Sequence, residues 1–427
     1  MVNVALPAIQ RDLGGGLALQ QWVVDAYLLT LGSLLLVGGS LGDLFGARRL
    51  FLIGIISFGL TSVLCAAAPD GTLLILGRGL QGVTGAILTP AGLAVIAATF
   101  SGEERGAAIG SWTAWTGIAF VIGPLVGGWL VTHASWRWVF IINVPFAIAT
   151  AALVAYAVPK QAPNPDRARV DFVGAGLCVL GLGGPVFALI EEPRRGWGDP
   201  LILISFFGGL AILATFLWWE NRTEQPMLPL RLFSKRNFSF ANIETLTVYA
   251  GLSTLTFFLV LFLQQLAGYS ALKSGLALIP ITVVMFALSP RVGRLSMRFG
   301  PRLFMGVGPL IAAASLLGLV RLKPGFSYWF ELLPPLVVFS VGLSMIVAPL
   351  TATVLADAGE RDAGIASGVN NAVARVAGLL GIAVVGALVA GSTNTLDLAG
   401  YHLSMIVTAA LVATGGVIGL AGIRNAT

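Results

Sequence analysis

Four charged residues lie inside long apolar stretches of this chain, where ionic side chains are rare: Asp25, Arg78, Glu244 and Arg375. A charge in hydrocarbon costs at least about 2.5 kcal/mol on insertion scales, so such residues face a partner or a functional cavity. A carboxyl group removed from water can exchange a proton, while a nearby arginine favours its ionised form. These residue types therefore indicate proton or ion exchange within a membrane.

The stretches that carry these charges must cross a membrane. Hydrophobic residues make up 57% of the 427 residues and charged residues only 10%, against about 25% charged in ordinary soluble domains. Apolar stretches of roughly 20 residues, enough for a helix to cross a core of about 30 Å, recur throughout. We predict an all-α polytopic membrane protein with complete spans at 20–41, 50–68, 72–99, 107–131, 137–158, 171–190, 200–219, 238–266, 273–290, 301–320, 329–355, 363–391 and 402–423.

A shorter apolar segment, residues 1–12, precedes these spans. As a helix it would reach only about 18 Å, little more than half the hydrocarbon core. It has neither the basic leader nor the small-residue cleavage site of a signal peptide. We interpret it as the second half of a truncated first helix, which brings the expected number of helices to fourteen.

A charged loop, GSLGDLFGARRL at Gly39–Leu50, joins the first two complete spans. Glycines permit tight turns there, and a carboxylate can accept hydrogen bonds from arginines or from a helix N-terminus. We predict a gating loop that latches two bundles in one conformation; the alternative is a solvated turn whose arginines only set orientation. The residues of this gating loop are Gly39, Gly42, Asp43, Gly46, Arg48 and Arg49.

Lysine and arginine positions predict the orientation. If the gating loop is cytoplasmic, the segments on its side of the membrane hold 16 of the 25 basic residues and the opposite side holds 7, as the positive-inside rule requires. The net charge of +6 then reflects topology and favours anionic lipid headgroups. A nucleic-acid partner is not expected, because no soluble basic domain is present.

The chain repeats itself. The gating loop aligns with GRLSMRFGPRLF at Gly293–Phe304, and ERGAAIGS from Glu104 resembles ERDAGIAS from Glu360 at nearly the same offset. The second copy has Met297 where the first has Asp43. This duplication predicts two six-helix bundles, 1–158 and 236–427, joined by a linker at 159–235 that contains two extra central helices. Repeated bundles are an architecture of secondary transporters.

Several motifs together resemble the major facilitator superfamily. The gating loop is similar to that family's loop G-x-L-a-D-r-x-G-r-[KR], and LGRGLQGVTGA at Leu76–Ala86 is similar to its fourth-helix arginine motif. GIAFVIGPLVGG at Gly117–Gly128 resembles the fifth-helix signature of antiporters. The segments Trp22–Leu29 and Trp136–Pro145, with the count of fourteen, resemble the fourteen-span drug:proton antiporters.

This resemblance implies a proton-coupled exporter of amphipathic organic compounds that works by alternating access, not an enzyme. It implies no cofactor, only the proton gradient; the expected partners are a small organic substrate, protons and the lipid bilayer. We expect a monomer in the cell membrane, with both termini cytoplasmic if the first helix is complete. The alternatives are an exporter of one metabolite or self-made antibiotic, and a transport-inactive sensor or truncated remnant.

The four charges within spans then receive roles in proton coupling or substrate binding. In the family, an acid on the first helix lies near the arginine that Arg78 resembles; that acid would precede Met1, so Asp25 is the best remaining partner. The alternatives are a wetted acid at Asp25 and an Arg78 that reaches the outer interface. Glu244 is a candidate proton or cation site, or a structural charge pair with Arg375 through long side chains or water.

The remaining polar and small residues carry weaker expectations. The antiporter-helix motif should form a close, bent packing seam, and its residues are Gly117, Gly123, Pro124, Gly127 and Gly128. Acids at span ends are expected as solvated caps: Glu191, Glu192, Glu220, Asp357 and Asp362. The dispersed histidines and cysteines predict no metal site and no disulfide: His133, His402, Cys65 and Cys178.

Overall fold

A computed structural model describes residues 1–159, 170–359, 362–390 and 395–425. Within these ranges, five side chains are not described: those of Asp43, Thr113, Ala114, Phe120 and Val121. Four basic residues used to predict the orientation lie outside the described residues: Lys160, Arg167, Arg169 and Arg361. The first two residues of the repeat ERDAGIAS also lie outside them.

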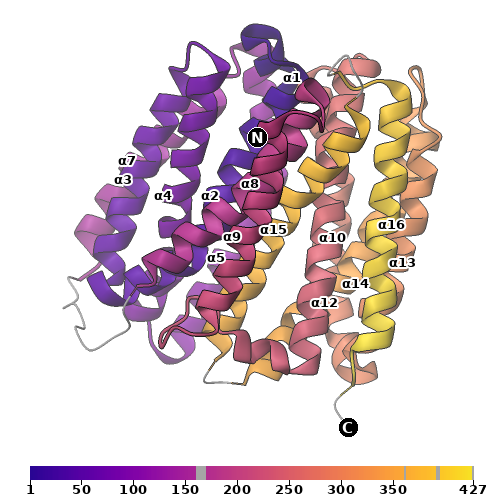
Figure 1. The fold of residues 1–427 in the computed structure, drawn as a ribbon. Coiled ribbons are helices and arrows are strands. Elements are labelled where there is room, and N and C mark those ends of the chain that lie inside the picture. Colours follow the sequence, from indigo (N-terminus) through magenta and orange to yellow (C-terminus); the bar gives the residue numbers. More distant parts are fainter. Residues whose placement is uncertain (160–169, 360–361, 391–394, 426–427) are drawn as a thin grey trace.

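The first half of the chain forms helices that run back and forth between two ends of the molecule. They are α1 (Val2–Leu13), α2 (Gly16–Phe45), α3 (Ala47–Ala66), α4 (Gly71–Thr99), α5 (Gly102–His133), α6 (Trp138–Ile141) and α7 (Asn143–Ala157). Two further long helices follow, α8 (Phe172–Arg195) and α9 (Pro200–Glu220). We call the two ends of the molecule the Asp12 end, uppermost in Figure 1, and the Gly46 end, where the C-terminus lies.

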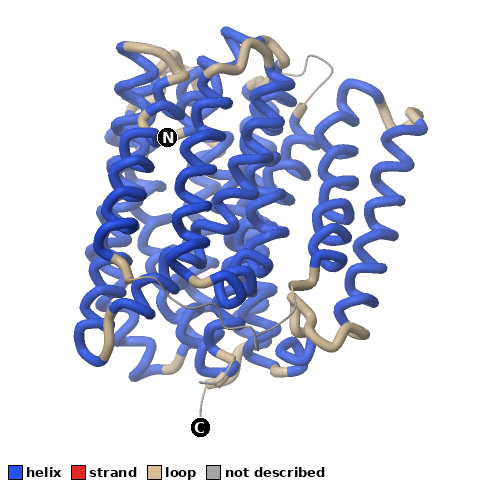
Figure 2. The backbone as a smooth tube through the Cα atoms, turned by 90° about the vertical axis from the view of Figure 1, so that its left-hand side faces the viewer, coloured by secondary structure: helices blue, strands red, loops and turns tan. Residues whose placement is uncertain are grey.

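The second half repeats this arrangement after a short 3₁₀ turn. Its elements are η1 (Leu230–Ser234), α10 (Arg236–Leu261), η2 (Phe262–Leu266), α11 (Ala271–Ala277), α12 (Ile279–Phe299), α13 (Pro301–Leu319), η3 (Tyr328–Leu332), α14 (Leu333–Ala358), α15 (Ala363–Val389) and α16 (Leu398–Gly422). The described residues contain helices and connections without any strand, as Figure 2 shows.

The predicted spans are confirmed. In the described part of the chain, thirteen helices are long and apolar enough to cross a membrane, and each covers one of the thirteen predicted segments. Helices are the expected solution, since hydrocarbon offers no hydrogen bonds and a helix satisfies its own backbone. The protein is therefore a multi-pass, all-α membrane protein, and α1 is a shorter helix of 12 residues.

Two groups of helices stand side by side, with the hairpin α8–α9 across the seam between them (Figure 1). Within the first group α2 packs on α4, and within the second α10 packs on α15 and α16. Helices α2 and α15 join the groups, and α8 packs against both. This arrangement is compatible with the expected linker hairpin, while the boundaries 1–158, 159–235 and 236–427 stay a prediction.

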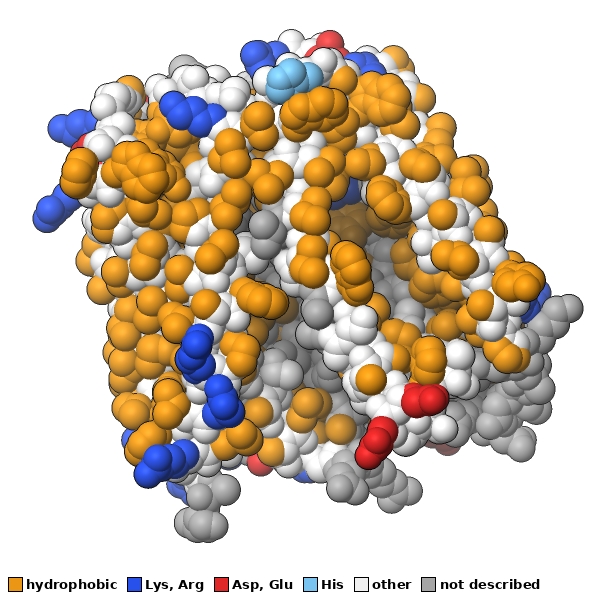
Figure 3. Space-filling view, turned by 180° about the vertical axis from the view of Figure 1, so that it is seen from behind, with side chains coloured by type: hydrophobic (Ala, Val, Ile, Leu, Met, Phe, Trp, Pro, Cys, Tyr) orange, Lys and Arg blue, Asp and Glu red, His pale blue; other side chains and the backbone are white. Residues whose placement is uncertain are grey.

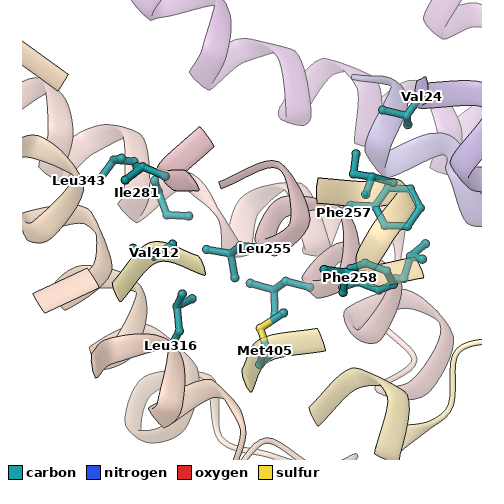
Figure 4. Packing of buried hydrophobic residues seen from close by; sticks show 14 of the residues in the cluster. Val24, Leu255, Phe257, Phe258, Ile281, Leu316, Leu343, Met405 and Val412 are labelled. Atoms are coloured by element: carbon teal, nitrogen blue, oxygen red, sulfur yellow. The ribbon is translucent and has the colours of Figure 1, made fainter. Parts of the chain in front are cut away.

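Side chains of α10 form the centre of the second group. Leu255, Phe257 and Phe258 are fully buried, and side chains from α12, α13, α14 and α16 surround them in Figure 4. Val24 of α2 lies at the edge of this cluster nearest Phe257 (Figure 4). The core of the second group therefore reaches the first group through α2.

The duplicated loops have the same backbone geometry. Gly46 joins α2 to α3 with φ 86° and ψ 133°, and Gly300 joins α12 to α13 with φ 82° and ψ 152°. Positive φ is readily adopted only by glycine. The one-residue turn therefore explains why both copies keep this glycine although Asp43 and Met297 differ.

The arginine two positions after each of these glycines donates hydrogen bonds to carbonyls near the end of another helix in both copies. Arg48 donates from Nε to the Val154 carbonyl and from Nη2 to the Ala155 carbonyl, at 3.4 and 2.6 Å. Arg302 donates from Nε to the Leu420 carbonyl at 2.7 Å. A cation at a helix C-terminus satisfies carbonyls that lack helical partners. Each arginine thus fastens the last helix of its own half.

We expect Arg48→Ala to lower thermal stability, because the last carbonyls of α7 lose charge-assisted hydrogen bonds worth about 1–3 kcal/mol in total. Arg49→Ala is the matched control, since Arg49 is the exposed neighbour on the same turn. Melting temperatures of both variants in detergent test this. Equal stability of the two variants would contradict the capping role of Arg48.

Candidate functional site

Arg78 is buried in the first group of helices and is fully engaged there. Its Nε donates to the Val23 carbonyl of α2 at 2.8 Å, and its Nη1 donates to Gln81 Oε1. Its guanidinium carbon lies 4.3 Å from the centre of the Tyr27 ring, within cation–π range. With 6% of its surface exposed, Arg78 does not reach the outer interface, so the alternative that it snorkels there is wrong.

Gln81 is the functional candidate that sequence reasoning missed. Its side chain accepts from Arg78 and donates from Nε2 to Ser62 Oγ on α3 at 2.7 Å. Asn143 of α7 donates to the same hydroxyl at 3.4 Å. A buried polar network of this kind fixes the position of the cation. The available signal was the glutamine one turn after the arginine in LGRGLQ, on the same helix face.

Asp25 does not pair with Arg78, and this part of the prediction is wrong. The carboxylate of Asp25 is completely buried, and neither of its oxygens has a hydrogen-bond partner among the described residues. Arg78 instead uses a backbone carbonyl and an amide. Its charge is therefore balanced by oriented dipoles, and Asp25 remains an unpartnered acid on the helix that joins the two groups.

Glu244 and Arg375 also lie apart. Glu244 is fully buried, and neither of its carboxyl oxygens has a hydrogen-bond partner within the described ranges. A Cβ added at Gly419 of α16 would lie 3.0 Å from its Oε2. Arg375 is on α15, where its Cβ would lie 3.1 Å from a Cβ added at Gly32 of α2. Glu244 thus faces the interior of the second group, while Arg375 lies at the junction of the groups. The described structure contains no ion pair between them.

The gating loop is described only in part. Residues Gly39, Gly42 and Asp43 belong to the last turns of α2, and the side chain of Asp43 is outside the described residues. The bonds made by Arg48 stay within the first group of helices. The loop therefore has a demonstrated structural role, and its proposed role as a latch is taken up below.

The antiporter-helix motif on α5 packs closely over only part of its length. A Cβ at Gly128 would lie 2.7 Å from the Ala271 carbonyl oxygen of α11, and one at Gly127 would lie 2.9 Å from Met1 Cα. A Cβ at Gly117 would meet nothing within 4 Å. The close seam that the sequence predicts is thus formed at the Asp12 end. Pro124 takes part in it, because its carbonyl oxygen lies 2.6 Å from a Cβ added at Gly275.

Amide side chains close the same end. Gln20 of the first group and Gln265 of the second each donate to Oε1 of Gln10, at 2.9 and 2.7 Å. Gln264 donates to the Val4 carbonyl at 3.0 Å. Figure 3 shows hollows at about mid-height on the face opposite to that of Figure 1. The hydrogen bonds named here, among the residues that the structure describes, join the two groups at the Asp12 end through neutral groups.

One predicted cap is buried instead of solvated. Glu220, at the end of α9, is only 2% exposed and accepts a hydrogen bond from the Leu228 backbone N–H at 2.8 Å. The chain after α9 folds back over this carboxylate, which sequence proximity did not reveal. Asp362 also differs from a solvated cap, because Arg231 binds it through two hydrogen bonds.

The described residues contain no group of three His, Cys, Asp or Glu side chains suited to a metal ion. The polar chemistry within the described spans is instead that of single charges: one arginine held by dipoles, one arginine at the junction, and two unpartnered carboxyl groups. Such a set can bind or release protons and contact a charged ligand; it contains no nucleophile held by a base.

The fold is similar to that of two solved membrane transporters. The peptide transporter PepTSo matches with a TM-score of 0.71 at 14% identity, over 98% of this chain and 93% of its own. A bacterial homologue of the human lysosomal transporter Spinster, in an inward-facing and unoccupied conformation, matches with a TM-score of 0.67 at 17% identity, over 98% and 92% of the two chains.

Sequence comparison identifies the family. The Major Facilitator Superfamily matches residues 1–382. An uncharacterised MFS-type transporter, EfpA of Mycobacterium tuberculosis (strain ATCC 25618 / H37Rv), is 37% identical over 399 residues, 93% of this chain and 74% of that protein. The puromycin resistance protein pur8 of Streptomyces alboniger is 37% identical over 92% and 78% of the two chains. The methylenomycin A resistance protein of Bacillus subtilis (strain 168) is 34% identical over 95% and 87%.

The chain belongs to the Major Facilitator Superfamily, a family of transporters and not of enzymes. The predicted resemblance to this family is confirmed.

We expect Gly128→Ala to impair closure at the Asp12 end, because a methyl group there would overlap the α11 backbone. Gly117→Ala is the matched control, since its methyl group enters open space. Thermal stability and transport by each variant in vesicles check this. A Gly128→Ala protein as stable and active as Gly117→Ala would show that α5 and α11 do not pack so closely.

We also expect Arg78→Lys to reduce transport by about tenfold or more, because an ammonium group cannot reproduce the planar donor set that binds Val23 and Gln81. Gln81→Leu should have a similar effect, since it leaves Arg78 and Ser62 without a shared partner. Transport rates in vesicles, normalised to folded protein, measure both effects. Wild-type rates in both variants would exclude the Arg78–Gln81 network from function.

Proposed function

We propose that the protein is a proton-coupled exporter of amphipathic organic compounds, working by alternating access between its two groups of helices. The observation that supports proton coupling is the burial of two carboxyl groups within the spans. Asp25 and Glu244 are each 0% exposed and have no hydrogen-bond partner in the part of the chain that the structure describes. An ionised carboxylate without a partner is costly to bury, so each is a candidate proton carrier.

Alternating access is supported by the kind of contact that joins the two groups of helices. The Asp12 end is joined by amide hydrogen bonds and by glycine packing between α5 and α11. Hydrogen bonds between neutral amides are modest in strength, about 0.5–1.5 kcal/mol each. Opening at this end would therefore break the amide hydrogen bonds named above, none of which is a buried ion pair.

We assign the Gly46 end to the cytoplasm from the basic residues of its loops. Asp43, Arg48 and Arg49 would then act as a latch that forms when this end closes. Met297 cannot supply a second acidic latch, so the proposed device operates in the first half only.

The names of the relatives support an organic compound as the transported substrate. The names of several describe resistance to or export of antibiotics, including puromycin, methylenomycin A and tetracenomycin C. The second candidate is export of one metabolite or self-made antibiotic, which the same names support.

Everted vesicles with an imposed proton gradient test the coupling. Addition of a panel of antibiotics should dissipate the gradient, and Asp25→Asn or Glu244→Gln should reduce this by about tenfold, because an amide cannot carry the proton. Glu224→Gln, at an exposed position of the α9–α10 connection, is the control. Normal coupling in both buried-acid variants would remove Asp25 and Glu244 from the mechanism.

A further inference from the structure

An apolar cavity of about 270 Å³ lies between the α8–α9 hairpin and both groups of helices. Its wall includes Leu36 of α2, Leu182 of α8, Phe216 of α9, Leu246 of α10 and Val373 of α15, and none of its lining side chains is charged. Neither the charges within the spans nor the gating loop is part of this wall. The cavity is thus separate from the groups that the proposed function uses.

The cavity lies at the depth of lipid acyl chains. Asn242 and Leu246 are the seventh and eleventh residues of α10 from the Gly46 end, and the helical rise places them roughly 10 and 15 Å from that end. The hydrocarbon of one leaflet extends about 15 Å. The cavity therefore spans the depth of a single leaflet at the Gly46 end.

Two residues of the wall on α10 are also exposed on the surface of the protein. Ile243 and Leu246 line the cavity and are nevertheless 44% and 36% exposed. No amide or charge on these two side chains would favour water. Apolar cavities of this kind stay dry. If such a cavity is empty, its lining side chains lose van der Waals contacts that an apolar molecule would provide. Acyl chains are the apolar molecules that any membrane supplies at this depth.

The floor of the cavity is held in place, so the space is preformed. Met227 and Leu228 of the α9–α10 connection lie in the wall. Glu220 Oε2 accepts from the Leu228 N–H, and Arg231 binds Asp362 through two hydrogen bonds of 3.0 and 2.8 Å. These bonds attach the connection to α9 on one side and to the start of α15 on the other.

We propose that this cavity binds one acyl chain of a membrane lipid from the leaflet at the Gly46 end. At about 30 Å³ for each water-sized group, the volume holds roughly nine such groups, a substantial part of one chain. The bound chain fills the space between the hairpin and the α2–α15 seam. This site goes beyond the proposed function and does not depend on it.

Photolabelling of the reconstituted full chain tests the site. The probe is phosphatidylglycerol with a diazirine in one acyl chain, and labelled peptides are mapped by mass spectrometry. We expect labelling of the cavity wall on α9, α10 and α15 to exceed labelling at Ile204 of α9, which is 69% exposed and outside the cavity. Even labelling of all lipid-facing helices would overturn the proposal.

Variants then separate the site from general lipid contact. Ile243→Trp should fill part of the cavity and lower labelling at Val373 by about fivefold, equivalent to roughly 1 kcal/mol of binding. Ile204→Trp, a matched change on the exposed face, should leave it unchanged. Because Ile243 is partly exposed, the larger side chain is expected to be compatible with folding. Unchanged labelling at Val373 in the Ile243 variant would overturn the assignment.

One further comparison identifies the occupant. Displacement of the acyl-chain label by excess ethidium would assign the cavity to organic cargo and overturn the lipid proposal.

Discussion

The absence of water from the hydrocarbon core is the constraint on which this structure depends. Backbone groups must be satisfied within each helix, and every charge within a span needs a partner from the protein or a reason to be there. Arg78 meets this requirement with a carbonyl, an amide and an aromatic ring. If Asp25 and Glu244 were ionised, their charges would have no partner among the described residues. These two acids are therefore the candidates for binding and releasing a proton.

The same constraint explains the duplicated turns. A helix that ends at the membrane surface leaves carbonyls without partners, and Arg48 and Arg302 supply donors to the last helix of their respective halves. The glycine before each arginine makes the one-residue turn possible through its positive φ. Shared structure thus accounts for the residues that the two copies retain. The two copies differ in having Asp43 or Met297 at one position. The shared structure does not explain this difference, and the proposed latch uses Asp43.

Closure at the Asp12 end uses neutral groups. Gln10 accepts hydrogen bonds from both groups of helices, and Gly128 lets α5 approach the backbone of α11. In the proposed alternating-access cycle this end opens and closes repeatedly, so its contacts have to be individually weak. Amide hydrogen bonds and small-residue packing satisfy that requirement, whereas buried ion pairs would leave an uncompensated charge at each opening.

By itself, the sequence determined the thirteen spans and the two turn motifs, because hydropathy, length and glycine geometry act locally along the chain. Only the tertiary structure decided which groups meet. In the folded protein Arg78 donates hydrogen bonds to Val23 and Gln81 and does not pair with Asp25. Glu220 is buried beneath the chain that follows α9. The tertiary structure also created the cavity under the hairpin, since partners and empty volume depend on how separate helices pack, which no local pattern encodes.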